Sequence, residues 1–238
     1  MRLRVKFSAS VPKWHCDPSS NDDVFCHDGI ESCRRIAVSD GATESYDSRT
    51  FAQALCQAWV NGPFTDWPLK RALRDYTAHY TGRPMSWSDL GAFERGSFAT
   101  FLGVSLVGDR LKALAVGDSL MTIHGREEQL TFPFTSAEQF NNRPTLFSTA
   151  RAANHFYKPS QLRAKTHFHV VHPGDRVFLM TDAIGAWFLS QNERDEARGL
   201  LESLSTADLF QQWIDSERQN KRIRNDDTTL IHLEVEDE

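Results

Sequence analysis

The sequence predicts an α+β fold in which antiparallel sheets are covered by helices. Two observations lead to this prediction. Short apolar segments with the period of a strand are joined by only a few residues, and helical periodicity occurs in two blocks that interrupt and close the run of strands. This order is typical of a sandwich with helices packed on its sheets. Because the 238 residues contain no linker, internal repeat or low-complexity segment, we expect residues 1–238 to form a single domain.

Ten segments have the composition and boundaries of β-strands. They are rich in apolar and β-branched residues, and turn signals such as Gly108-Asp109 and Pro173-Gly174-Asp175 separate several of them. Short connections between neighbours favour antiparallel pairing. The predicted strands are 2–9, 23–27, 34–39, 97–107, 110–117, 119–124, 127–133, 166–171, 176–181 and 228–235.

Four segments have helical periodicity. In the first, Phe51, Leu55 and Trp59 recur on one face, as expected for a helix that packs on a sheet. The predicted helices are 48–60, 67–80, 183–203 and 206–220. The polar stretch 136–165 is the only part that resembles an extended surface excursion.

Composition narrows the class of protein. The net charge of −5 is spread over interspersed acids and bases, so no nucleic-acid partner is expected. The first residues alternate charged and apolar side chains, which indicates an edge strand rather than a signal peptide. No apolar run approaches the ~20 residues that cross a bilayer. We therefore expect a cytoplasmic monomer without a membrane partner.

The four cysteines are expected to be reduced and mostly buried. Cys16, Cys26, Cys33 and Cys56 contain no Cys-x-x-Cys pair. A structural zinc site is the alternative, but such sites usually have tighter ligand spacing.

Aspartates cluster at the ends of the predicted strands. A single Asp in such a place is usually a turn or capping residue. As a set, carboxylates without His or Cys suit Mg²⁺, Mn²⁺ or Ca²⁺, and without a cation they would repel one another. The acids are Asp22, Asp23, Asp40, Asp118, Asp182, Asp226 and Asp227.

This carboxylate set predicts metal-dependent phosphoester hydrolysis. Gly41, directly after Asp40, has no side chain to block a cation from its carbonyl oxygen. Two such cations about 3.5–4 Å apart could clamp a phosphoryl group for in-line attack.

Six motifs in order carry a resemblance to a known family. They are Asn21-Asp22-Asp23, Val38-Ser39-Asp40-Gly41-Ala42-Thr43-Glu44, Gly96-Ser97-Phe98-Ala99-Thr100, Val116-Gly117-Asp118-Ser119, Thr181-Asp182-Ala183 and Asn225-Asp226-Asp227-Thr228-Thr229. Each motif alone is weak, but the series resembles the metal-dependent type 2C serine/threonine protein phosphatases, particularly their compact bacterial branch. The resemblance spans residues 21–235.

The resemblance implies a fold and an activity. The fold would be a four-layer αββα sandwich, with two central antiparallel sheets flanked by helix pairs. The activity would be hydrolysis of phosphoserine and phosphothreonine on proteins by a hydroxide bound to two Mn²⁺ or Mg²⁺ ions, without a phosphoenzyme. The substrate would be a phosphorylated protein, with a Ser/Thr kinase as the opposing enzyme.

The resemblance also implies roles for the metal ligands. Asp40 bridges the two ions and is central to catalysis, and Gly41 contributes its carbonyl oxygen. Asp182 and Asp226 complete the protein ligands of the first ion. Asp22, in place of the usual Glu, serves the second ion.

Three further acids receive supporting roles by the same resemblance. Asp23 orients the attacking water and is the second catalytic residue. Asp118, together with Asp182, helps to hold a weaker third ion in some members of the family. Asp227 lies behind the ligands and supports them.

The basic groups of the family are only partly matched. Ala42 stands where some members have a His proposed as the general acid, and no Arg occurs shortly before Asn21, where some members bind the substrate phosphate. Lys13 and His15 are the nearest basic candidates for that contact, although a solvated loop is the alternative. Lys221, Arg222 and Arg224 precede Asp226, either as a solvated turn or as a screen for the acids.

Two other functions stay open. The chain could be a weak or inactive member of the family that binds phosphoproteins as a regulatory module, because the His and Arg are missing. It could also hydrolyse small phosphorylated molecules on the same scaffold. The complete acid set favours a phosphoprotein phosphatase.

Overall fold

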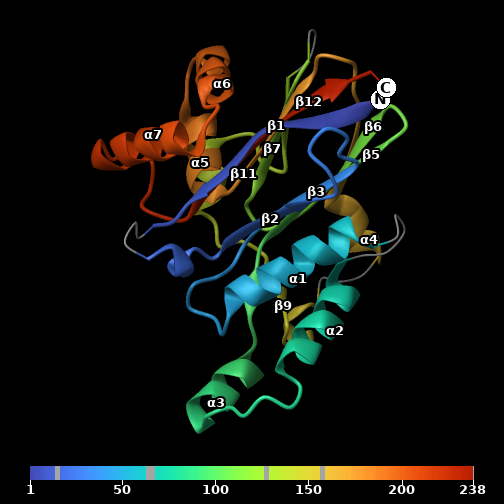
Figure 1. Ribbon diagram of the computed structural model, residues 1–238, viewed down its shortest axis with the longest axis vertical. Coiled ribbons are helices and arrows are strands. Elements are labelled where there is room, and N and C mark those ends of the chain that lie inside the picture. The colour runs from blue at the N-terminus through green and yellow to red at the C-terminus, as the bar shows by residue number, and fades with distance from the viewer. Residues whose placement is uncertain (14–16, 63–67, 126–128, 156–158, 238) are drawn as a thin grey trace.

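Two five-stranded antiparallel sheets form the centre of the molecule (Figure 1). The structure is a computed structural model, and it describes residues 1–13, 17–62, 68–125, 129–155 and 159–237. The first sheet has the order β1 (Arg2–Val11), β12 (Thr228–Glu236), β11 (Arg176–Met180), β7 (Leu120–His124) and β8 (Gln129–Phe132). The second has the order β10 (Thr166–Val170), β6 (Arg110–Val116), β5 (Phe101–Val107), β3 (Arg35–Asp40) and β2 (Asp23–His27).

Helices cover the outer face of each sheet, so the predicted four-layer αββα sandwich is confirmed. Below the second sheet lie α1 (Ser48–Val60) and α2 (Pro68–Tyr80), and α3 (Trp87–Arg95) projects beyond them (Figure 1). The first sheet is covered by α5 (Asp182–Ser190), α6 (Arg194–Ser203) and α7 (Ala207–Gln219). A short α4 (Pro159–Ala164) precedes β10. No helix in the described ranges is long and apolar enough to span a membrane.

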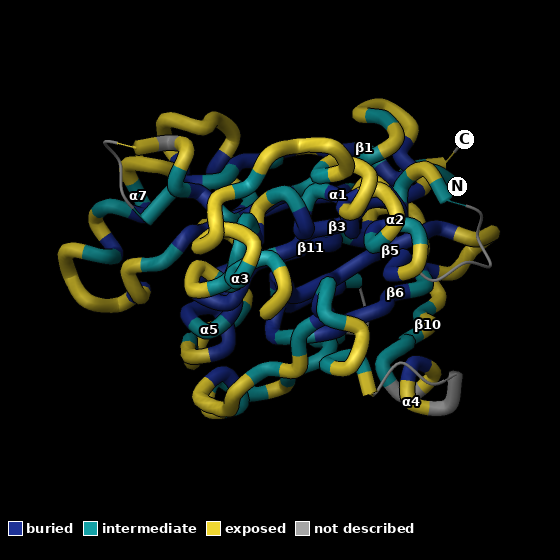
Figure 2. The backbone as a smooth tube through the Cα atoms, turned by 90° about the horizontal axis from the view of Figure 1, so that it is seen from below, coloured by how far each residue is buried: buried dark blue, intermediate teal, exposed yellow. Residues whose placement is uncertain are grey.

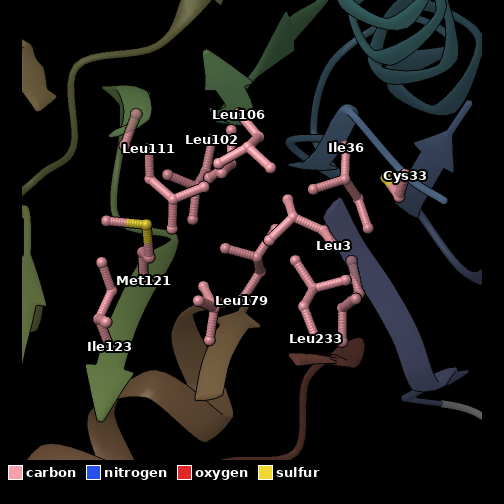
Figure 3. Packing of buried hydrophobic residues seen from close by; sticks show 14 of the residues in the cluster. Leu3, Cys33, Ile36, Leu102, Leu106, Leu111, Met121, Ile123, Leu179 and Leu233 are labelled. Carbon is pink, nitrogen blue, oxygen red and sulfur yellow. The ribbon is translucent and has the colours of Figure 1, made fainter. Parts of the chain in front are cut away.

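The inner faces of both sheets supply one apolar core. Leu3, Leu179 and Leu233 from the first sheet meet Ile36 and Leu102 from the second (Figure 3). The buried strands run through the interior, and the exposed segments lie on the outside of the helices (Figure 2). Residue burial alternates along β1, as expected for an edge strand with one face buried at a time.

A β-bulge in β1 lets one strand serve two cores. Val5 pairs with Leu233 and Phe7 with His232, so Lys6 is an extra residue in the ladder. An extra residue reverses the alternation of faces. Leu3 and Val5 therefore enter the core between the sheets, whereas Phe7 packs in the core under α5–α7.

Several boundaries differ from the sequence prediction. The single helix expected over 183–203 is two helices, because Gln191 takes an extended backbone and Glu193 starts a new helix. The strand expected over 97–107 is divided at Thr100 into β4 (Phe98–Ala99) and β5. Each block also contains three helices among the described residues, where the sequence predicts a pair.

Elements that bury little were missed. Helix α3 buries none of its residues, so apolar periodicity gives no signal for it, although Ser86 and Asp89 form a capping box at its start. The stretch 136–165 contains the 3₁₀ helices η2 (Ala137–Asn141) and η3 (Arg151–Ala153), the two-residue strand β9 (Phe147–Ser148) and α4. A further 3₁₀ turn, η1 (Pro18–Ser20), precedes β2.

Candidate metal centre

The acid motifs lie at one edge of the sandwich because of strand pairing. Asp23 and Asp40 are cross-strand partners at the start of β2 and the end of β3. In the other sheet Met180 pairs with both Leu120 and Leu230, which places the end of β11 beside the starts of β7 and β12. Since strands in an antiparallel sheet begin where their neighbours end, the residues that flank these strands meet at one place.

Asp40 is surrounded by other carboxylates. Its backbone is held by Thr100, whose N–H donates to the Asp40 carbonyl oxygen at 2.8 Å and whose hydroxyl accepts from the Asp40 N–H at 2.9 Å. Although Asp40 is only partly buried by surface area, the protein around its carboxyl raises its pKa well above the usual range. Four negative charges raise that pKa further, those of Asp23, Asp182, Asp226 and Asp118.

Asp23 is a fixed carboxylate with one oxygen left over. Its Oδ2 accepts from the hydroxyls of Thr181 at 2.9 Å and Thr229 at 2.7 Å. Its Oδ1 is buried and has no hydrogen-bond partner within the described residues. Burial raises the pKa of Asp23 well above its usual range, and the charges of Asp227 and Asp182 add to the rise.

Asp227 ties the two loops beside the site together. Its two carboxylate oxygens accept from the backbone N–H of Lys13 and of Asp22, each at 2.7 Å. The Asp22 carboxylate in turn accepts from the Ser48 hydroxyl at 3.0 Å, and burial raises its pKa. This arrangement supports the prediction that Asp227 positions ligands.

Gly41 is required here by packing. A Cβ at this position would lie 2.8 Å from the Cβ of Ser48 and 2.9 Å from its carbonyl carbon, which is closer than any side chain tolerates. The glycine therefore lets the start of α1 approach the end of β3. That approach also brings Ser48 to Asp22.

Asp182, at the start of α5, forms an ion pair with Arg224. The guanidinium Nη2 donates to Oδ2 at 2.7 Å, while Oδ1 is buried and has no partner among the described residues. Burial raises the pKa of Asp182 to about 7, and the charge of Arg224 opposes that rise. Asp118 is also buried, which raises its pKa, and again Arg224 acts in the opposite direction.

Of the two basic residues predicted to contact the substrate phosphate, only Lys13 lies among the described residues. Lys13 is at the site, where its ammonium donates to the Thr43 hydroxyl at 2.7 Å and its charge lowers the pKa of Asp22. His15 lies outside the described residues. Ala42 is half-buried beside the cluster, and its N–H donates to the Phe98 carbonyl oxygen at 2.9 Å.

The donor set suits a hard cation in its chemistry and its location. All the candidate side chains are carboxylates, and two buried oxygens, Oδ1 of Asp23 and Oδ1 of Asp182, lack a partner in the described part of the chain. Even so, no three His, Cys, Asp or Glu side chains among the described residues converge on one point. The reason is visible in the contacts, because Ser48, Thr181, Thr229 and Arg224 each hold one acid.

Sequence reasoning missed the groups that hold the acids. The hydroxyls of Ser48, Thr181 and Thr229 have no signal of their own, apart from the position of Thr181 directly before Asp182 and of Thr229 two residues after Asp227. For Arg224 the sequence leaves open a solvated turn or a general screen for the acids. Its contact with Asp182 connects residues 42 positions apart.

Comparison with known proteins agrees with this description. The family model of Protein phosphatase 2C matches residues 17–226. No curated protein matches the chain in sequence.

Three solved structures show the same fold. The Mycobacterium tuberculosis serine/threonine phosphatase PstP/Ppp is 15% identical, with a TM-score of 0.60 and all of both chains covered (100% and 100%). The catalytic domain of PstP in complex with 2 manganese ions is 16% identical, with a TM-score of 0.61 and 99% of each chain covered. The phosphatase Stp1 from Staphylococcus aureus is 13% identical, with a TM-score of 0.58 and coverage of 100% of this chain and 98% of that one.

Proposed function

The chain belongs to the protein phosphatase 2C family, and from that premise we propose that it hydrolyses phosphoserine and phosphothreonine monoesters on proteins with the help of two Mn²⁺ or Mg²⁺ ions. The observation that carries the proposal is the surroundings of Asp40: Asp23 is its cross-strand partner, burial raises the pKa of its carboxyl, and the charges of four other aspartates raise that pKa further. Such a cluster is unfavourable unless cations neutralise it.

Six residues would hold the ions. Asp40 would bridge them, and the carbonyl oxygen of Gly41, with Asp182, Asp226 and Asp22, would complete the set, while Asp118 lies at its margin. Mn²⁺ or Mg²⁺, when bound, lowers the pKa of water and neutralises charge on the phosphoryl group. Asp227 keeps Asp22 in place through the Asp22 N–H.

Asp23 would orient the attacking water. Thr181 and Thr229 fix its Oδ2, so the carboxylate cannot rotate freely, and Oδ1, which has no partner among the described residues, remains to accept a hydrogen bond from a water molecule. On the substrate side, the Lys13 ammonium could approach a phosphate oxygen. The Lys13 backbone N–H donates to the Asp227 carboxylate, which anchors this part of the chain.

The partners follow from the chemistry. The substrate is a phosphorylated protein, which implies an opposing Ser/Thr kinase. Cytoplasmic location, the monomeric state and the single-domain organisation of residues 1–238 stay predictions.

The test is release of phosphate from a phosphothreonine peptide. We expect turnover with added Mn²⁺ and none after exhaustive chelation, because the oxygen ligands bind these ions reversibly. Asp40→Asn should lower kcat by at least about a hundredfold, since an amide cannot neutralise two cations. Asp208→Asn, an exposed acid in the first turn of α7, is the control and should behave like the unchanged protein. Full turnover in chelated protein would refute the proposal.

The regulatory alternative has two specific observations in its favour. Arg224 already occupies Asp182, and Ala42 supplies no proton to a leaving alkoxide. General acid catalysis is typically worth about 10²–10⁴-fold, so its loss slows turnover without abolishing it. Binding of the phosphopeptide with no phosphate release at any Mn²⁺ concentration would favour a binding module. Turnover of small phosphate esters but not of peptides would favour the third function.

A further inference from the structure

One cation of the protein itself forms an ion pair with the acid cluster. In the described part of the chain, Arg224 with Asp182 is the only ion pair within 4.0 Å that involves any of the seven clustered aspartates. The Arg224 guanidinium donates a charge-assisted hydrogen bond to Oδ2 of Asp182 at 2.7 Å, and Asp182 is itself nine-tenths buried.

The loop before β12 delivers Arg224 from a fixed backbone. Ile223, directly before it, is buried in the core under α5–α7, and its N–H donates to the Glu217 carbonyl oxygen at 3.3 Å. After it, the Asp226 N–H donates to the Arg224 carbonyl oxygen at 3.0 Å. Arg218 from α7 binds the Asp226 carbonyl oxygen and, at 3.0 Å, that of Pro12. The guanidinium position is therefore set by the tertiary structure.

The contact puts a positive charge on a buried carboxylate. Asp182 is 9% exposed, so water solvates its charge poorly. Through the hydrogen bond to Oδ2, Arg224 does for Asp182 what a bound cation would do.

We propose that Arg224 is a resident cation of the metal centre, which neutralises Asp182 and takes the place of a metal ion at Oδ2 of that carboxylate. This inference rests on the proposed function, because it concerns the same cluster. Arg224 engages only Oδ2 of Asp182, so Oδ1, which is buried and unpartnered in the described structure, is left for a cation shared with the other acids.

Removal of the guanidinium should open a further cation site. With Arg224 replaced by Ala, Oδ2 of Asp182 loses its positively charged partner in a buried place. Oxygen ligands of this kind bind Mn²⁺ or Mg²⁺. The Arg224 side chain is half exposed, 53% by area, so its truncation leaves no hole in the core.

The experiment is a Mn²⁺ titration of the full chain, freed of metal, by isothermal calorimetry and by electron paramagnetic resonance. We expect Arg224→Ala to bind one more Mn²⁺ per chain than the unchanged protein at millimolar Mn²⁺. Arg224→Lys keeps the charge and should keep the original number. Arg222→Ala is the matched control, because this neighbouring arginine pairs with Glu217 at 2.5 Å instead of with the cluster.

The outcomes separate this inference from the proposed function. An unchanged number of bound ions in Arg224→Ala overturns the resident-cation role, and a lower number shows instead that Arg224 only orients Asp182 for a metal. In both cases Mn²⁺ binding by the unchanged protein leaves the proposed function standing. If neither protein binds Mn²⁺, both the inference and the proposed function fail.

Discussion

At the scale of single residues, the environment of each titratable group decides its chemistry. Two thiols of the same chain illustrate this. Cys26, on β2, accepts a hydrogen bond from the Gln53 amide at 3.2 Å, and the neighbouring Cys56 thiol is the main cause that lowers the pKa of Cys26 to about 7. Burial instead raises the pKa of Cys33 to about 12. Reduced thiols were expected, but this difference between them was not.

We therefore predict that Cys26 is alkylated at neutral pH and that Cys33 is not. The thiolate is the reactive form, so the rate at Cys26 should rise with pH and reach half of its maximum near pH 7. Site-resolved mass spectrometry of the folded protein with iodoacetamide measures both rates. Gln53→Ala removes one donor and should move the Cys26 midpoint to higher pH. A midpoint near the ordinary thiol value in the unchanged protein would contradict the assignment.

At the scale of elements, the bulge in β1 shows how one residue sets the register of a strand. Lys6 is the extra residue, and its ammonium lies on the surface 3.1 Å from Glu234. Without it, Val5 and Phe7 would be neighbours in a regular strand and would still point to opposite faces. The faces that these residues occupy are therefore compatible with both a bulged and a regular ladder.

Deletion of Lys6 should accordingly be tolerated. We expect a loss of no more than about 1–2 kcal/mol, because the lost surface ion pair contributes little and the pairing after Phe7 is kept. Deletion of Ser8 should cost more, about 3 kcal/mol or greater, since a regular strand then turns Phe7 away from its ring contact with Phe210. Urea denaturation followed by circular dichroism compares the two. Equal losses of unfolding free energy in the two deletions would show that the bulge stabilises the strand irrespective of which face Phe7 occupies.

At the scale of the whole molecule, the sandwich brings repelling charges to one edge. The acids come from both sheets, so their repulsion acts directly on the packing of the two layers. Asp40 and Asp23 have strongly raised pKa values, and that of Asp182 is raised to about 7. Raised values in the folded state mean that the folded protein binds protons which the unfolded chain has already released.

The sign of the pH dependence follows. Stability from these carboxyls is complete below about pH 4, the ordinary value for Asp, and is lost as the pH rises through their folded-state values. His124 and His232, with pKa values lowered to about 4, act in the opposite sense over about pH 4–6.5. Both histidines are present in a variant that lacks one repelling carboxylate. Their contribution therefore drops out when the free energy of unfolding of that variant is compared with that of the unchanged protein.

In the presence of chelator, we expect Asp40→Asn to be more stable than the unchanged protein, by an amount that grows between pH 5 and pH 8 to at least about 1 kcal/mol. Added Mn²⁺ should remove or reverse this advantage, because bound cations neutralise Asp40. Urea denaturation at the two pH values, with and without Mn²⁺, provides the measurement. A pH-independent difference would mean that Asp40 is not repelled by its neighbours in the metal-free protein.

The sequence by itself determined the class of fold, most strands and the identity of the clustered acids. These features are local: strand period, turn residues and the position of an Asp at a strand end can all be read along the chain. The family resemblance, confirmed by the match over residues 17–226, added the two-sheet architecture. The prediction failed for α3, which has no fully buried residue, and for the break between α5 and α6.

Only the tertiary structure decided which groups hold the acids. Thr181 reaches Asp23 across 158 residues, and the Asp22 N–H reaches Asp227 across 205 residues. Such contacts have no period along the chain, because they depend on how two sheets and their covering helices pack. For the same reason Arg222 and Arg224, two residues apart in one basic turn, have different partners: one binds Glu217 of α7, and the other binds Asp182 at the start of α5.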